Sequence, residues 1–372
     1  MAAMDLRQPG ATPLSRRALV LALGGASALV GASERGAILP SDGTRYDDPS
    51  TEFEVRRLTR PSYSSFLPAW PGRAASRRND FVILASDRTG SAELHRLDLK
   101  SGQSRVLAAL SDARAFTLSA DDRMVYFRDR QSVFALALAG APRPVPLWRS
   151  PHPDDRGPLS PSEDGTALWF TTPTDQGAGL MKLRLGARPE PFLVLQRATI
   201  VEPVPNPHRA LVLWRSDGDS LWMCEHDGSS VRRLDTPPGR VRQAMWSPDG
   251  QSVLYLHDPG SAGGSVAIRE QDVDARADRL VANTSQYACF ACNANASVFL
   301  GVSRSQAGPY VLLLLRITRR ELPLCEHRSH DASASSLAFS PDSQRLFFQG
   351  DAEGKSVVYS MKLDKLVEKT EA

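Results

Sequence analysis

Short apolar stretches alternate with polar turns along most of this chain. In "WSPDGQSVLYLHD", which starts at Trp246, a Ser-Pro-Asp-Gly turn leads into a run of apolar residues. A second polar turn then leads into a stretch where apolar and polar residues alternate, as in "ELHRLDL" from Glu93. A continuous apolar run is typical of a strand buried on both faces, and alternation is typical of a strand with one exposed face. Each unit therefore predicts several short strands joined by turns.

The same unit recurs along the chain. Its seven copies begin at Phe81, Leu118, Leu159, Val204, Trp246, Cys292 and Phe339. A period of roughly forty residues or slightly more, with several short strands in each unit, is the signature of a β-propeller. The sequence therefore predicts an all-β fold, a seven-bladed β-propeller of four-stranded blades.

A propeller must also close its ring. The stretch "FEVRRLT" at residues 53–59 alternates like an outer strand and precedes the first copy. We expect it to pair with the strand that includes Val357 to Met361, although a looser ring with an unpaired first strand is the alternative. The propeller is then predicted to span residues 46–364. A leader segment on the surface (33–45) and a charged tail (365–372) would flank it.

The N-terminal residues have the pattern of an export signal. Arg16 and Arg17 precede a run of apolar and small residues from Ala18 to Ala32. This run is shorter than the roughly 20 residues of a membrane-spanning helix. The paired arginines predict a twin-arginine-type signal peptide over residues 1–32 and a periplasmic or secreted protein without membrane contact after cleavage. An uncleaved anchor is the alternative.

Composition sets limits on the class of protein. The chain has 372 residues, of which 41% are hydrophobic and 23% charged, which is enough for a sizeable core. A net charge of +3 is too small to indicate a nucleic-acid partner. The four cysteines are too few for a disulfide scaffold, and we expect free thiols, with one disulfide or a ligand role as alternatives; they are Cys224, Cys289, Cys292 and Cys325.

Several segments resemble known propeller families. The Ser-Pro-Asp-Gly units match the repeats of TolB-like and WD40-like propellers. More specifically, "YDDPSTEFEVRRLTR", "LWMCEHDGSSVRRL" and "LPLCEHRS" resemble segments of the oligogalacturonate lyases. This resemblance implies a seven-bladed propeller that cleaves unsaturated digalacturonate, a pectin fragment, by β-elimination. It also implies a manganese ion held by three His and one Gln in the central channel, beside a catalytic His.

The residues that this resemblance implies for catalysis are substituted here. The position of the catalytic His falls at Gln243, whose amide cannot act as a base near neutral pH. The positions of the metal ligands fall at Cys289, Asp331, Ala334 and Ser336. Alanine has no donor atom and serine is a poor ligand, so we predict no manganese site of the family type. A rearranged manganese site that uses His327 or His330 is the alternative.

Arginines near the predicted blade ends suggest a different role. Arg215, Arg240 and Arg242, together with Gln243, are the candidate substrate-binding residues, because guanidinium groups bind carboxylates bidentately. We predict an exported propeller that binds an acidic oligosaccharide such as a galacturonide and has reduced or lost lyase activity. Whether it is still an enzyme remains open. The alternative is a TolB-like protein-interaction propeller without a sugar site, whose protein partner the sequence does not identify.

Overall fold

The computed structural model describes residues 35–111, 113–152, 155, 157–216, 220–261 and 264–370. The predicted signal peptide lies outside these residues. Within them, no helix is both long and apolar enough to cross a membrane. The one helical turn in this part of the chain is η1 (Ala332–Ala334).

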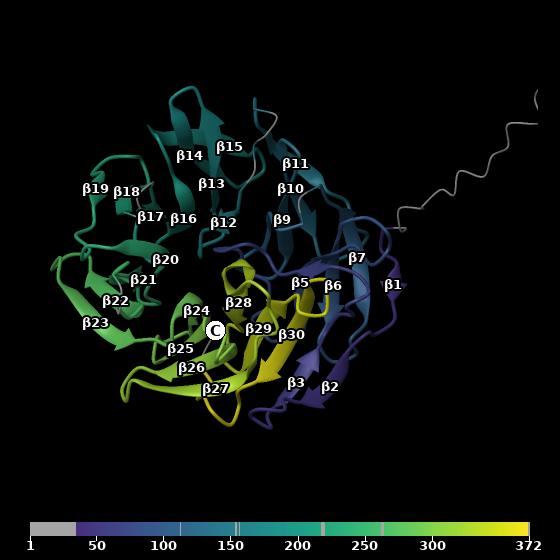
Figure 1. Cartoon of the computed structure of the whole chain (residues 1–372). Helices are drawn as coiled ribbons and strands as arrows, with labels where there is room; N and C mark the ends of the chain where they lie inside the picture. Colours follow the sequence, from purple (N-terminus) through teal and green to yellow (C-terminus); the bar gives the residue numbers. More distant parts are fainter. Residues whose placement is uncertain are drawn as a thin grey trace, which may run out of the picture. The chain divides into compact units, whose positions relative to one another are not determined.

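Seven sheets, here called blades 1 to 7, are arranged in a ring (Figure 1). In chain order, blade 1 contains β4 (Ser65–Phe66), β5 (Phe81–Ser86), β6 (Glu93–Asp98) and β7 (Ser104–Ala109). Blade 2 contains β8 (Phe116–Leu118), β9 (Met124–Asp129), β10 (Ser132–Ala137) and β11 (Val145–Arg149). Blade 3 contains β12 (Ser160–Pro161), β13 (Ala167–Thr174), β14 (Gly177–Arg184) and β15 (Glu190–Arg197). Blade 4 contains β16 (Val201–Pro205), β17 (Leu211–Arg215), β18 (Leu221–Glu225) and β19 (Arg232–Arg233).

In blades 1 to 6, the four strands follow one another in the chain from the innermost to the outermost, and blade 7 takes its fourth strand from the N-terminal segment. Blade 5 contains β20 (Arg240–Trp246), β21 (Ser252–Asp258), β22 (Ala267–Asp272) and β23 (Asp278–Asn283). Blade 6 contains β24 (Tyr287–Cys292), β25 (Val298–Ser303), β26 (Tyr310–Leu315) and β27 (Arg320–Glu326). Blade 7 contains β28 (Leu337–Phe339), β29 (Arg345–Gly350), β30 (Val357–Lys362) and β3 (Glu54–Arg57). The prediction of an all-β seven-bladed propeller is confirmed.

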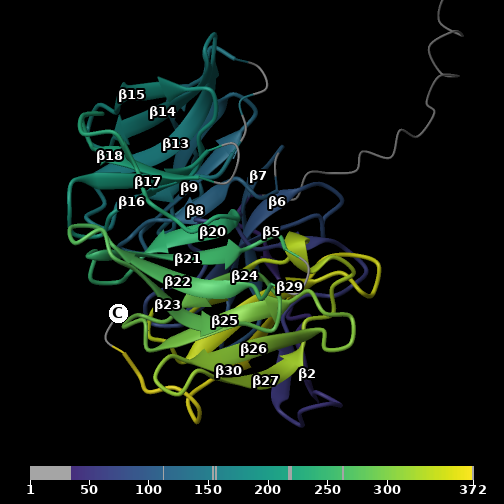
Figure 2. The same cartoon turned by 60° about the vertical axis from the view of Figure 1, so that its left-hand side comes forward.

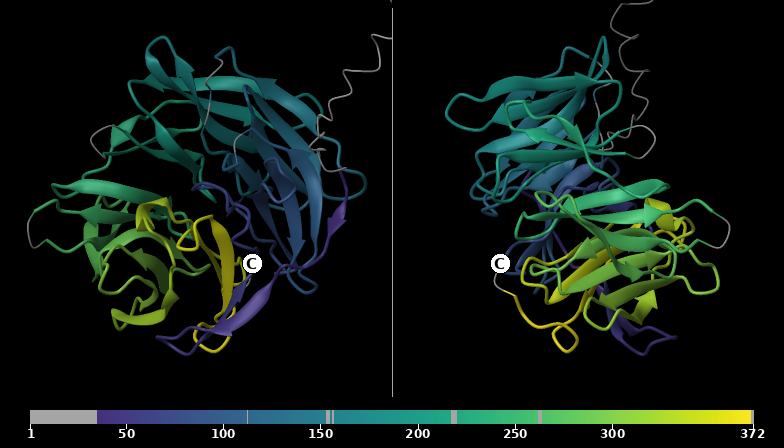
Figure 3. Two further views of the ribbon diagram at one scale, coloured as in Figure 1. Left: turned by 45° about the vertical axis from the view of Figure 1, so that its right-hand side comes forward. Right: turned by 90° about the vertical axis from the view of Figure 1, so that its left-hand side faces the viewer.

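The N-terminal segment closes the ring as expected. Strand β3 pairs antiparallel with β30, with Val55 opposite Met361. Beyond the strand, Leu58 N donates to Val358 O over 2.8 Å. Figure 3 shows β3 in purple beside the yellow β30. The first and last parts of the propeller therefore share one blade.

The segment 33–45, which the sequence assigned to a surface leader, contains one strand and the beginning of a second. β1 (Ile38–Leu39) pairs with β7, and β2 (Thr44–Asp47) pairs with β3. Blades 1 and 7 thus gain a fifth, outermost strand. At the other end, Val367 packs into the core of blades 6 and 7 and is only 6% exposed. Parts of both flanking segments therefore pack against the propeller.

Hydrophobic contacts between neighbouring blades hold the ring together. Between blades 5 and 6, Leu254 and Leu256 of β21 share a cluster with Phe290 of β24 and Phe299 of β25, and all four are buried. Figure 2 shows these two blades stacked against each other. Full burial of one such side chain contributes about 1.5–3 kcal/mol. This packing fixes the innermost strands, which surround the middle of the ring.

Candidate ligand-binding cavity

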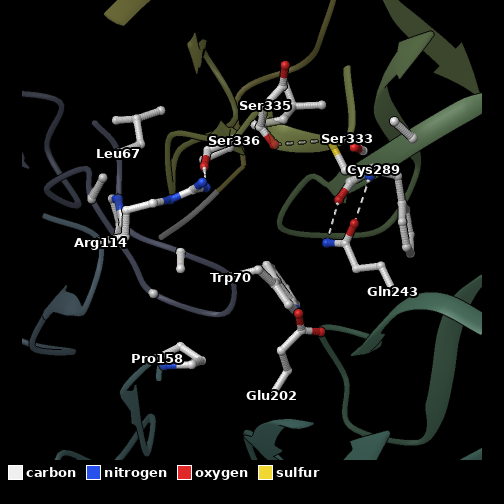
Figure 4. A pocket seen from close by; sticks show the side chains of 18 of the residues that line it. Leu67, Trp70, Arg114, Pro158, Glu202, Gln243, Cys289, Ser333, Ser335 and Ser336 are labelled. Atoms are coloured by element: carbon white, nitrogen blue, oxygen red, sulfur yellow. Dashed lines mark hydrogen bonds between the residues drawn. The ribbon is translucent and has the colours of Figure 1, made fainter. Parts of the chain in front are cut away.

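All seven blades contribute to one cavity in the middle of the ring. Its volume is about 470 Å³, within the usual range of small-molecule sites, which is roughly 300–1,000 Å³. The contributing residues lie in or next to the innermost strands. In blade order they include Trp70, Arg114, Pro158, Glu202, Arg242 and Gln243, Cys289, and Ser336. Figure 4 shows most of these side chains around the cavity. A closed ring of seven short strands thus converges on a single site.

Three consecutive blades carry a β-bulge at the cavity. The register of β20 against β21 skips Arg242, and that of β24 against β25 skips Ala288. The register of β16 against β17 skips Glu202 and Pro203. A bulge inserts an extra residue and redirects its side chain, and bulges are common beside functional sites. Glu202, Arg242 and Ala288 all line the cavity, so the bulges place these residues there.

Gln243 lies at the cavity and connects two blades. Its Nε2 donates to Phe290 O over 3.0 Å, and its Oε1 accepts from Phe290 N over 2.9 Å (Figure 4). The side chain is only 7% exposed. An amide group can donate two hydrogen bonds and accept two, so half of this capacity is used by the backbone of β24. Substrate binding by Gln243 stays a prediction, limited to the remaining N–H and lone pair.

The three predicted arginines occupy different environments. Arg242 lines the cavity, and its Nε and Nη2 bind Asp258 Oδ2 over 2.9 and 2.5 Å. Arg215 lies behind the lining and binds Glu202 through Nη2 over 2.9 Å. Arg240 is exposed and does not line the cavity. Of the three, Arg242 is therefore the residue placed to contact a ligand.

Two charged lining residues were missed by the sequence interpretation. Arg114 precedes β8, and its Nη2 donates to Ser336 Oγ over 3.0 Å. Glu202 has φ of 53°, which is uncommon for a residue other than glycine. Burial raises the pKa of Glu202, and the neighbouring Arg215 opposes this shift. Neither residue belongs to a recognisable motif, and a bulge leaves no periodic signal in the sequence.

The positions implied for metal ligands provide a poor donor set. Cys289 lines the cavity, but burial raises the pKa of its thiol to about 12, so it is protonated and donates to Ser335 O. Ser336 also lines it, and its hydroxyl accepts from the cationic Arg114. Asp331 is absent from the lining and instead caps η1 by accepting from Ser333 N over 2.9 Å. Ala334 lies within η1.

The alternative histidine ligands lie away from the cavity lining. His327 is 3% exposed, its Nδ1 accepts from Ser329 N, and burial lowers its pKa. His330 is exposed beside Asp351, with 3.4 Å between Nδ1 and Oδ1. Among the described residues, no group of three or more His, Cys, Asp or Glu could hold a metal ion. The residues present at this site therefore do not fit a bound manganese.

All four cysteines are free in the structure, so the alternative of a disulfide is not realised. Burial raises the pKa of Cys224, Cys289 and Cys292 to about 12, and it also raises that of Cys325. Thiolate is the reactive form of cysteine. These cysteines therefore behave as small apolar core residues.

The fold and cavity define a seven-bladed propeller with an axial cavity of about 470 Å³. No protein-family model and no curated protein matches the sequence. Among solved structures, an oligogalacturonate lyase in complex with manganese is similar, with a TM-score of 0.81 and 19% identity over 88% of this chain and 98% of that chain. The oligogalacturonate lyase from Vibrio parahaemolyticus is also similar, with a TM-score of 0.80 and 16% identity over 89% of this chain and 99% of that chain.

A TolB from Acinetobacter baumannii gives a TM-score of 0.48 at 16% identity, over 62% of this chain and 58% of that chain. The two lyase structures match this chain over nearly its whole propeller. The resemblance inferred from the sequence is thus confirmed at the level of the fold: this chain shares the architecture of the oligogalacturonate lyases.

Proposed function

We propose that this protein binds a small acidic saccharide of the galacturonide type in the axial cavity, without metal-dependent elimination. The observation that carries the proposal is the pair of arginines in the cavity lining, Arg114 and Arg242. The fold shared with the oligogalacturonate lyases supports the class of ligand. The substituted metal and base positions support the absence of elimination chemistry.

Both guanidinium groups are held in place before a ligand arrives. Arg242 is fixed by Asp258 on the neighbouring strand β21, and Arg114 by the Ser336 hydroxyl next to β28. Within the described part of the chain, Nη1 of Arg242 has no hydrogen-bond partner. Side chains that are already ordered lose little freedom on binding, so more of the interaction energy appears as affinity. A carboxylate is the ligand group that best matches a guanidinium.

Replacing either arginine should weaken galacturonate binding. Arg114→Gln and Arg242→Gln each remove a charge-assisted hydrogen bond worth about 1.5–3 kcal/mol, so we expect the Kd to rise at least ~10-fold. Isothermal titration calorimetry with galacturonate and digalacturonate measures this. Arg240→Gln is the matched control, because Arg240 lies two residues away on the same strand but outside the cavity lining.

Equal losses in the Arg240 and Arg242 variants would place the binding site elsewhere. Absence of binding to both ligands by the wild-type protein would contradict the proposed function. That result would favour the alternative, a protein-interaction propeller without a sugar site.

We also propose that the protein acts in the periplasm or outside the cell, after export by the twin-arginine route. The support is the Arg16-Arg17 pair directly before the apolar run. The double variant Arg16→Lys, Arg17→Lys should remain in the cytoplasm, as measured by cell fractionation and immunoblotting against the wild type. An unchanged periplasmic yield of the double variant would indicate the general secretory route instead.

A further inference from the structure

Glu202 places a negative charge in the wall of a cavity that also presents two arginines. Arg215 donates two hydrogen bonds to Glu202, and both reach the same oxygen, Oε2, from Nη2 over 2.9 Å and from Nε over 3.2 Å. Within the described residues, no hydrogen bond reaches the second oxygen, Oε1. One side of this carboxylate is thus fixed by an ion pair, and the other can accept a hydrogen bond from a ligand.

Trp70 also lines the cavity and has an unused donor. In the view of Figure 4, the Glu202 carboxylate points toward the Trp70 indole, and Arg114 and Ser336 lie further along the cavity wall. The Nε1 of Trp70 is buried and has no hydrogen-bond partner. A buried donor without a partner is destabilising, and a ligand that accepts this hydrogen bond removes that cost. A hydroxyl group can accept from Trp70 and donate to Glu202 at the same time.

The backbone at Glu202 has a conformation that residues other than glycine rarely adopt. Residues in sparsely populated backbone conformations are strained and cluster at functional sites. Glu202 combines a φ of 53° with a β-bulge in the middle of the innermost strand of blade 4. A bulge redirects the side chain of the extra residue, and Glu202 lines the cavity at this point.

We propose that Glu202 determines the ligand specificity of the cavity: with Trp70 it binds a hydroxyl of a sugar that carries one carboxylate, and it excludes a second carboxylate at this wall. The proposal rests on the proposed function, in which the arginines bind the first carboxylate. Like charges brought together in a desolvated site repel each other strongly. The cavity then accepts a uronic acid and rejects the corresponding dicarboxylic sugar acid.

Calorimetry with two ligands of the same carbon skeleton tests this. Galacturonate carries one carboxylate, and galactarate carries a second one at the other end. We expect the wild-type protein to bind galacturonate at least ~10-fold more tightly than galactarate at neutral pH. In Glu202→Gln, this preference should shrink at least ~10-fold, mainly because galactarate binds better. Glu225→Gln, in the same blade but outside the cavity lining, is the control and should keep the wild-type preference.

A pH series separates ligand contact from a purely structural role. The charged groups around Glu202 are Arg215, behind it on β17, and Arg114 and Arg242 in the cavity lining, where Cys289 is a neutral thiol. Burial raises the pKa of Glu202, so the carboxylate gains a proton at a less acidic pH than usual. In the wild type, the ratio of the Kd for galactarate to the Kd for galacturonate should therefore fall as the pH is lowered from neutral to mildly acidic. It should change less in Glu202→Gln, which cannot titrate.

Three results would overturn the inference. Equal affinity of the wild type for both ligands, or an unchanged preference in Glu202→Gln, would do so while the proposed function stands. Failure of the wild type to bind either ligand would overturn both the role of Glu202 and the proposed function. Thermal unfolding monitors the fold of each variant, because Glu202 also holds Arg215. If Glu202→Gln does not fold, Glu202→Asp and the wild-type pH series decide instead, since Asp keeps the charge and should keep the rejection of galactarate.

Discussion

A chain that begins at residue 61 is expected to form no stable propeller, because it lacks strand β3. This strand buries Val55 completely and is followed by Leu58, which is 2% exposed. Each of these side chains contributes about 1.5–3 kcal/mol on burial. The truncation also removes the pairing of β3 with β30 and leaves β30 as an open edge. A domain has a net free energy of unfolding of only about 5–15 kcal/mol. The stability lost by the truncation is therefore comparable to the entire net stability of the propeller.

A chain that begins at Asp48 is the matched control for this truncation. It lacks β1 and β2 but keeps β3, so the ring can still close. We expect it to unfold cooperatively at a reduced Tm, whereas the shorter chain aggregates or shows no cooperative transition by circular dichroism. A wild-type-like melting curve for the chain that begins at residue 61 would mean that ring closure contributes little to stability.

The fold could be predicted because the pattern that defines it repeats. Seven copies of one strand-and-turn unit each bury the same kind of positions, so an error in one copy does not change the overall assignment. β5, for example, is a continuous apolar run in the sequence and is buried at every residue. The outermost strands β1 and β2 were missed because edge strands are short and bury little, so they carry no clear apolar period.

The site could be predicted only in part, for a local reason. Gln243, Cys289 and Ser336 line the cavity because they lie in or next to innermost strands, whose position follows from the repeat. Arg114 and Glu202 line it as well, but the first lies in a connecting segment and the second in a β-bulge. A bulge shifts the alternation by one residue, so it changes which side chains face the cavity. Such a shift depends on the pairing of strands and cannot be seen in one strand alone.

The wild-type protein is expected to show no manganese-dependent cleavage of unsaturated digalacturonate, and Gln243→His is not expected to create it. Loss of a general base typically costs about 10²- to 10⁴-fold in rate, and loss of a metal ion that stabilises developing charge costs several kcal/mol more. A histidine at position 243 would still lack a bound cation, because Ser336 holds the Arg114 guanidinium and Cys289 is a protonated thiol.

The same substitution should also damage the structure, which gives it a second measurable effect. Gln243 binds both the N–H and the carbonyl of Phe290, and an imidazole cannot reproduce this pair of hydrogen bonds in the same geometry. Each buried backbone group left unpaired costs about 1–3 kcal/mol, so Gln243→His and Gln243→Ala should both lower the Tm. Activity is followed by the absorbance of the unsaturated uronate with manganese and with a chelator, using protein from a host without pectin lyases. Wild-type turnover that the chelator abolishes would contradict the prediction, and His327 and His330 would then be the first ligands to replace.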